Sequence, residues 1–122
     1  MKIVKSDGLG LFLTMGSYVF ASCTSLTDVS FGDALETLTD HTFQGCTSLN
    51  DPHLGGGLKT IGEYAFDGCT SLTAITIPET VEQIKADAFA RCSALESIHL
   101  PDSVSVMGGM VFYECGNLTA ER

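Results

Sequence analysis

Basic residues are scarce in this 122-residue chain, which has six Lys and Arg against fifteen Asp and Glu and a formal net charge of −9. This shortage argues against nucleic acid as a partner, because phosphate binding needs a surplus of Lys and Arg. An anionic membrane surface is disfavoured for the same reason. No apolar run reaches the ~20 residues that span a bilayer, so membrane insertion is not expected. With 44% apolar residues, the chain has enough apolar side chains for a buried core.

Motifs of catalysis and metal binding are also missing. The sequence contains no G-x-S-x-G, H-E-x-x-H or P-loop pattern. It has no Cys-x-x-Cys and no spacing of Cys and His that is typical of zinc fingers. We therefore expect no enzyme activity, no metal site and no cofactor.

The chain does contain an internal repeat. The five cysteines recur every 23 residues, at Cys23, Cys46, Cys69, Cys92 and Cys115. Five of the seven phenylalanines share this spacing, at Phe20, Phe43, Phe66, Phe89 and Phe112. Leucines do the same at Leu26, Leu49, Leu72, Leu95 and Leu118. No insertion or deletion interrupts the period, which is typical of a repeat architecture.

The clearest repeat unit spans residues 61–84. Its segment 75–77 places Thr76 between two isoleucines, and this alternation predicts a short strand buried on one face. Pro78 ends that strand because it has no N–H for a ladder. The segment 65–68 predicts one tight helical turn with a buried Phe66 and a glycine at its exit.

A single unit of this length cannot bury both its strand and its phenylalanine, whereas stacked units can. We therefore predict an α/β repeat solenoid, a right-handed superhelix similar to leucine-rich repeats. It would have one parallel sheet of short strands, ~4.8 Å apart, and return segments that are irregular or short 3-10 helices. Residues 1–122 would form one domain of about five repeats, with 1–14 a degenerate first repeat and 119–122 a truncated last one.

The pattern L-x-x-I-x-I-P-x-x-V-x-x-I-(G)-x-x-A-F-x-G-C resembles the BspA-like leucine-rich repeat, the 23-residue class of treponemal surface proteins. Residues 61–101 carry it best. The matching positions are Ile61-Gly62, Ala65-Phe66, Gly68-Cys69, Leu72, Ile75, Ile77-Pro78, Val81, Ile84, Ala88-Phe89, Cys92, Leu95, Ile98 and Leu100-Pro101. The ordinary leucine-rich repeat has Asn or Cys three residues after the strand. The equivalent positions here are Ala34, Gly57, Thr80 and Ser103, which favours the BspA-like class over the ordinary one. The resemblance implies a binding or adhesion role and a cell-surface or extracellular location.

The cysteine column predicts free, buried thiols. The number of cysteines is odd, and stacked side chains that point in parallel have poor geometry for a disulfide. Small buried hydrophobic side chains account for the column without a metal or a disulfide framework.

Three stretches depart from the regular repeat. Lys2 and Lys5 precede an apolar stretch, and residues 20–23 loosely resemble a lipoprotein cleavage site. Because Phe20 and Cys23 already belong to the repeat, no signal peptide is predicted. Neither end resembles a dedicated cap, which suggests a longer array or exposed edge strands that pair with another copy. Pro52 and the glycines 55–57 predict a weakened sheet beside a flexible corner.

The outward strand face is the concave surface that solenoids use for binding. Small polar and acidic residues occupy it, and we expect it to hydrogen bond with a polypeptide or a glycan. It lacks the aromatic anchors of a strong interaction hot spot. The expected binding residues are Thr27, Asp28, Ser30, Asn50, Asp51, His53, Thr73, Thr76, Glu96, Ser97 and His99. His53 and His99 lie two repeats apart, ~10 Å, too far to share one zinc ion.

Two functions remain open on the sequence alone. The first is a non-enzymatic protein-binding or adhesion module that uses the concave strand face. The alternative is a structural or assembly subunit, or a fragment of a longer array, that self-associates through the open solenoid ends.

Overall fold

The structure is a computed structural model that describes residues 2–5 and 16–121. Most of the degenerate repeat predicted for residues 1–14 therefore lies outside the described residues, as does most of the apolar stretch considered as a signal peptide. The strands are β1 (Lys2–Lys5), β2 (Asp28–Phe31), β3 (Thr37–Leu38), β4 (Asp51–His53), β5 (Thr60–Ile61), β6 (Ala74–Thr76), β7 (Gln83–Ile84), β8 (Ser97–His99), β9 (Val106–Met107) and β10 (Ala120–Glu121). None of the described residues belongs to a helix of the length and apolarity that crossing a membrane requires.

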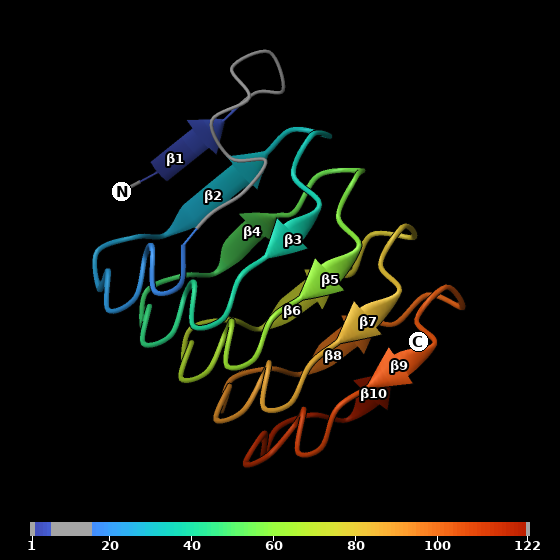
Figure 1. The fold of residues 1–122 in the computed structure, drawn as a ribbon. Helices are drawn as coiled ribbons and strands as arrows, with labels where there is room; N and C mark the ends of the chain where they lie inside the picture. Colours follow the sequence, from blue (N-terminus) through green and yellow to red (C-terminus); the bar gives the residue numbers. More distant parts are fainter. Residues whose placement is uncertain (1, 6–15, 122) are drawn as a thin grey trace.

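The strands form two columns along the solenoid (Figure 1). The first column contains β1, β2, β4, β6, β8 and β10, and the second contains β3, β5, β7 and β9. All pairs are parallel. The predicted solenoid of parallel strands is confirmed. The expectation of a single sheet is wrong in one respect, because the four return segments that contain residues 37–38, 60–61, 83–84 and 106–107 each carry a two-residue strand of a second sheet.

The strand register matches the 23-residue period. Val29 pairs with Pro52, Ile75 with Ile98, and Ile61 with Ile84. In β4 and β6 the central residue is buried and both neighbours are exposed, as the alternation predicts. Equivalent positions of successive coils therefore lie on top of one another.

The core is built from columns of equivalent side chains. The rings of Phe43, Phe66 and Phe89 are fully buried and stacked, with centroids 5.4 and 5.1 Å apart. The column continues to Phe20 and Phe112, which are partly buried, at centroid distances of 5.5 and 6.0 Å. The predicted phenylalanine column is confirmed.

The predicted tight turn forms between residues 62 and 69, without becoming a helix in the described part of the chain. The Asp67 N–H donates to the Tyr64 carbonyl at 3.1 Å, and the Cys69 N–H donates to the Phe66 carbonyl at 3.1 Å. Both bonds span three residues, which is the 3-10 spacing. The turn holds Tyr64 at φ 58° and leaves through Gly68 at φ 77°, so the expected glycine exit is confirmed.

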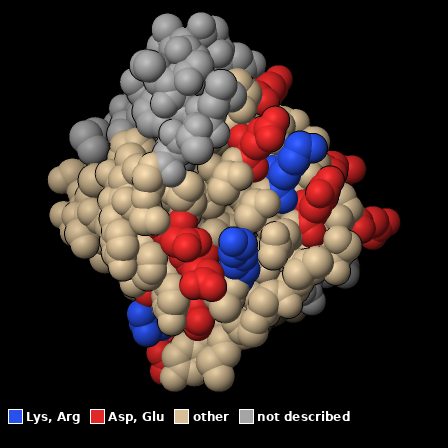
Figure 2. All heavy atoms as spheres, in the orientation of Figure 1, with Lys and Arg blue, Asp and Glu red and all other residues tan. Residues whose placement is uncertain are grey.

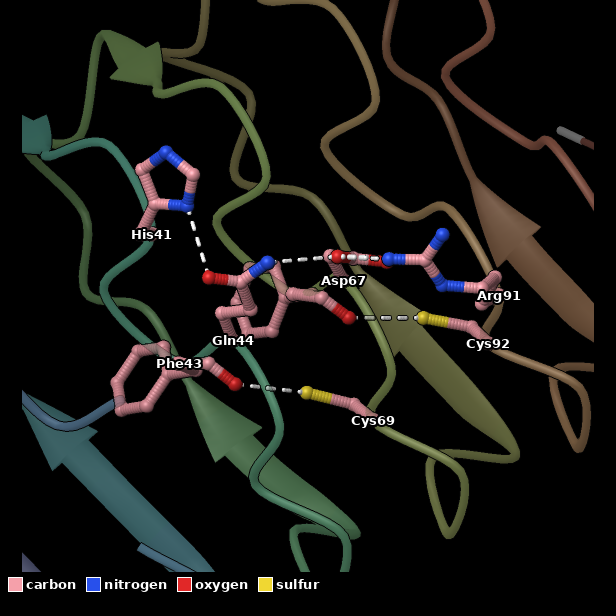
Figure 3. Close-up of polar contacts among 8 residues, drawn as sticks. His41, Phe43, Gln44, Asp67, Cys69, Arg91 and Cys92 are labelled. Atoms are coloured by element: carbon pink, nitrogen blue, oxygen red, sulfur yellow. Dashed lines mark hydrogen bonds and ion pairs between the residues drawn. The ribbon is translucent and has the colours of Figure 1, made fainter. Parts of the chain in front are cut away.

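All five cysteines are free, and four of them connect neighbouring coils. The thiols of Cys69 and Cys92 donate to the carbonyls of Phe43 and Phe66 in the preceding coil, at 3.3 and 3.1 Å (Figure 3). Cys46 and Cys115 make the same contact at 3.0 Å each. Burial raises the pKa of Cys46 to about 11, so this thiol stays protonated at neutral pH. The prediction of five buried thiols is wrong for Cys23 and Cys115, which are only half-buried and are the two end members of the cysteine column.

The glycine corner, which the sequence predicts to be flexible, is tightly packed against the preceding coil. Gly55 has φ +81°, and a Cβ there would lie 2.3 Å from the carbonyl oxygen of Gly32 in the preceding coil. The Gly56 N–H also donates to the Asp33 carboxylate at 2.8 Å. Gly55 and Gly57 approach the preceding backbone too closely for a side chain, which explains glycine at these two positions. The expected weakening of the sheet is confirmed, since the first column is interrupted between β4 and β6.

Candidate binding surface

The predicted binding residues lie together on the outer side of the first strand column. We call this surface the strand face, formed by residues 27–30, 50–53, 73–76 and 96–99. Strand register places Ser30 beside His53 and Thr76 beside His99. None of the eleven predicted residues is buried, because the inward positions of each strand take up the apolar side chains.

The strand face is polar and acidic, without Lys or Arg in its four segments. His53 Nε2 lies 3.0 Å from Asp51 Oδ1, and both side chains are more than half exposed. His99 Nε2 lies 3.8 Å from Glu79 Oε2. In the part of the chain that the structure describes, no three His, Cys, Asp or Glu side chains are grouped to hold a metal ion. The surface therefore offers hydrogen bonds and negative charge to a ligand.

A hollow of about 500 Å³ occupies the centre of the strand face. Residues of β4, β6 and β8 line it, together with the segment that follows β4 and Pro78 after β6. Five of the predicted residues lie in its wall, namely Asp51, His53, Thr76, Ser97 and His99. The other six, Thr27, Asp28, Ser30, Asn50, Thr73 and Glu96, lie outside its lining. The hollow therefore lies at the middle of the predicted surface.

A polar network in the turns was not predicted from the sequence (Figure 3). Gln44 Nε2 donates to Asp67 Oδ2 at 2.8 Å, and Gln44 Oε1 accepts from His41 Nδ1 at 2.9 Å. Arg91 Nη2 donates to the same Asp67 oxygen at 2.6 Å. The Asp67 side chain is only 1% exposed, whereas that of Arg91 is 52% exposed. The network ties three successive coils together around a buried carboxylate.

His41 also belongs to a stack of rings at the edge of these turns. Its ring lies between Tyr18 and Tyr64, with centroids 4.3 and 5.0 Å away and interplanar angles of 7°. The negative charge of Asp87 raises the pKa of Tyr64. The members of this register differ in type, so no single residue type reveals the stack in the sequence. The signal that could have found the stack is the 23-residue spacing of three planar side chains.

Acidic side chains elsewhere on the surface are dispersed. Figure 2 shows them in separate groups, with single Lys or Arg side chains beside some of them, on the side where the second strand column lies nearest the viewer. This mixed pattern contrasts with the strand face, whose four segments have no basic residue.

Comparison with known families identifies a repeat family that covers most of the chain. Residues 13–120 match the BspA type leucine rich repeat region, in six copies. The comparison with curated protein sequences gave no match.

Solved structures of bacterial leucine-rich repeat proteins are similar to the whole fold. A T. pallidum leucine-rich repeat protein is 34% identical, with a TM-score of 0.87 over 88% of this chain and 50% of its own. A Bacteroides ovatus leucine-rich repeat protein is 34% identical, with a TM-score of 0.90 over 98% of this chain and 30% of its own. A leucine-rich cell-surface protein of Faecalibacterium prausnitzii is 31% identical, with a TM-score of 0.90 over 98% and 31%. The chain thus spans between about a third and a half of the length of these proteins.

Proposed function

Because the chain belongs to the BspA-type leucine-rich repeat family, we propose that it is a non-enzymatic protein-binding module whose partner lies across the strand face. Repeat proteins of this kind generally bind partners on the extended surface that their stacked units create. The observation that carries the proposal is the hollow at the centre of this surface, whose wall includes polar side chains from three successive coils beside apolar ones. The F. prausnitzii relative supports extending the proposal to adhesion at a cell surface.

The chemistry of the surface indicates the kind of partner. Asp28, Asp51 and Glu96 give the strand face negative charge, and its segments have no Lys or Arg to offset it. A neutral or basic polypeptide segment would therefore be attracted, and an acidic one repelled. Because the surface lacks aromatic anchors, its affinity depends on hydrogen bonds made across several coils.

A peptide selection tests this proposal. Peptides from a phage-displayed random library are selected on the immobilised protein. Their affinities are then measured for the unaltered protein and for the variants Thr76→Arg and Ser93→Arg. Thr76 is exposed at the centre of the strand face, whereas Ser93 is exposed in a turn. Selected peptides should lose at least about tenfold in affinity, or 1.4 kcal/mol, with Thr76→Arg and keep it with Ser93→Arg. Equal affinity for the two variants would contradict the proposal.

The alternative, a subunit that assembles through its ends, is favoured by one observation. Large apolar side chains are exposed at the last described coil, namely Val106, Met107, Met110 and Tyr113. Such a surface suits a second copy or a further repeat. If assembly is the function, the molar mass from light scattering will rise with protein concentration, and Met110→Asp will abolish the rise. A constant monomer mass would leave the binding module as the only proposal.

A further inference from the structure

The ladder of the first strand column is open at one place. β4 pairs with β2, and β6 pairs with β8, but no hydrogen bonds join β4 to β6 although the two strands pack side by side (Figure 1). The same coils are joined elsewhere. The Phe43 N–H donates to the Ala65 carbonyl at 2.7 Å, and the Glu82 N–H donates to the Lys59 carbonyl at 2.8 Å. The opening is therefore local to the strand face.

Pro52 explains the opening. The Asp51 N–H donates to the Thr27 carbonyl on the β2 side, so the backbone nitrogen of the next residue faces β6. That residue is Pro52, which has no N–H to donate. On β6, the Ile77 N–H donates to the His99 carbonyl, so the N–H and C=O groups of Ala74 and Thr76 face β4. Donors and acceptors of the backbone are thus left without a strand partner.

The hollow of the strand face lies over this opening. Its lining includes Pro52 on one side and Ala74 and Thr76 on the other. The carboxylate of Asp51 lies in the wall, and that of Glu79 lies 3.8 Å from the lining residue His99. A ligand in the hollow therefore lies beside residues whose backbone groups have no strand partner, in a negatively charged setting.

We propose that this opening binds the carboxamide side chain of an Asn or Gln residue in the bound polypeptide. A carboxamide carries both donors and an acceptor, so it can accept from Ala74 or Thr76 and donate to the Pro52 carbonyl. A carboxylate has only acceptors, and it would meet the charges of Asp51 and Glu79. An ammonium group has only donors, and it would leave the β6 N–H groups unpaired. The inference rests on the proposed function, because it specifies what the strand face recognises.

The test uses three probes of similar size, namely propionamide, propionate and propylammonium. Each is titrated at equal concentration and ionic strength into the ¹⁵N-labelled full chain. Propionamide should shift the amide resonances of Ala74 and Thr76, and the two charged probes should leave them unchanged. Equal shifts from all three probes, or none from propionamide, would overturn the proposal.

Pro52→Val provides the matched variant, because the equivalent positions hold Val29, Ile75 and Ile98. It restores the missing N–H, so the ladder should close. The Ala74 and Thr76 amides should then exchange at least about tenfold more slowly than in the unaltered chain. The response to propionamide should disappear. Pro52→Ala, which restores the N–H with a smaller side chain, should have the same effects if Pro52→Val does not fold.

The propionamide and exchange experiments test the carboxamide site, whereas peptide binding by Thr76→Arg tests the proposed function. A response to propionamide that survives a closed ladder would overturn the inference, and so would slow exchange of Ala74 and Thr76 in the unaltered chain. With either of these outcomes, loss of peptide binding in Thr76→Arg would still support the strand face as the binding surface. If Thr76→Arg binds the selected peptides normally, the proposed function fails whatever propionamide does.

Discussion

Replacing Phe66 by alanine is expected to lower the free energy of unfolding by about 3–5 kcal/mol. Phe66 is fully buried and stacks on Phe43 and Phe89, at centroid distances of 5.4 and 5.1 Å. The coils cannot move together to fill the cavity, because backbone bonds hold them at a fixed spacing on both sides of the ring. Denaturant unfolding followed by circular dichroism measures the change.

Phe112→Ala is the matched control for this prediction. Phe112 is partly exposed, and among the described rings only Phe89 stacks on it, at a longer distance of 6.0 Å. Its loss should therefore cost clearly less than the loss of Phe66. Equal costs at the two positions would show that the column is not a continuous buried stack.

Arg91→Ala is expected to cost about 2–3 kcal/mol. Within this network, the substitution leaves the buried Asp67 carboxylate with the Gln44 amide but without its cationic partner. Removing one member of a fully buried ion pair costs about 3–5 kcal/mol. The value here is lower because half of the Arg91 side chain is exposed, so water can enter when it is removed. Thermal and denaturant unfolding measure the change.

The double variant Arg91→Ala/Asp67→Asn tests whether the buried charge is the cause. An uncharged amide can keep the contact with Gln44 and is less costly to bury than a carboxylate. The double variant should therefore be more stable than Arg91→Ala alone. If Arg91→Ala has no effect, the ion pair behaves as an exposed pair and does not tie the coils together.

The repeat could be predicted because identical residues recur in the core. The Phe and Cys columns need one side-chain type at each coil, since each member packs on the next, and this produces a visible period. The second sheet was not predicted, because a two-residue strand such as Thr60–Ile61 is too short to show alternation.

The polar features were harder to predict because they depend on differences between coils. Gln44 and Asp67 share a register, but Arg91 reaches Asp67 from the position that follows this register in the next coil. No repeated residue type reveals such a contact. The effect of Pro52 on the sheet could be predicted, but the side on which the ladder opens depends on the direction of one backbone N–H.

The most direct test of the account is a measurement of nuclear Overhauser effects between the phenylalanine rings in solution. Its central claim is that equivalent side chains of successive coils lie on one another. Cross-peaks should join Phe43 to Phe66 and Phe66 to Phe89, and none should join Phe43 to Phe89, which lie two coils and ~10 Å apart. A direct Phe43–Phe89 cross-peak, or the absence of both neighbouring ones, would contradict the stacked solenoid and the strand face built on it.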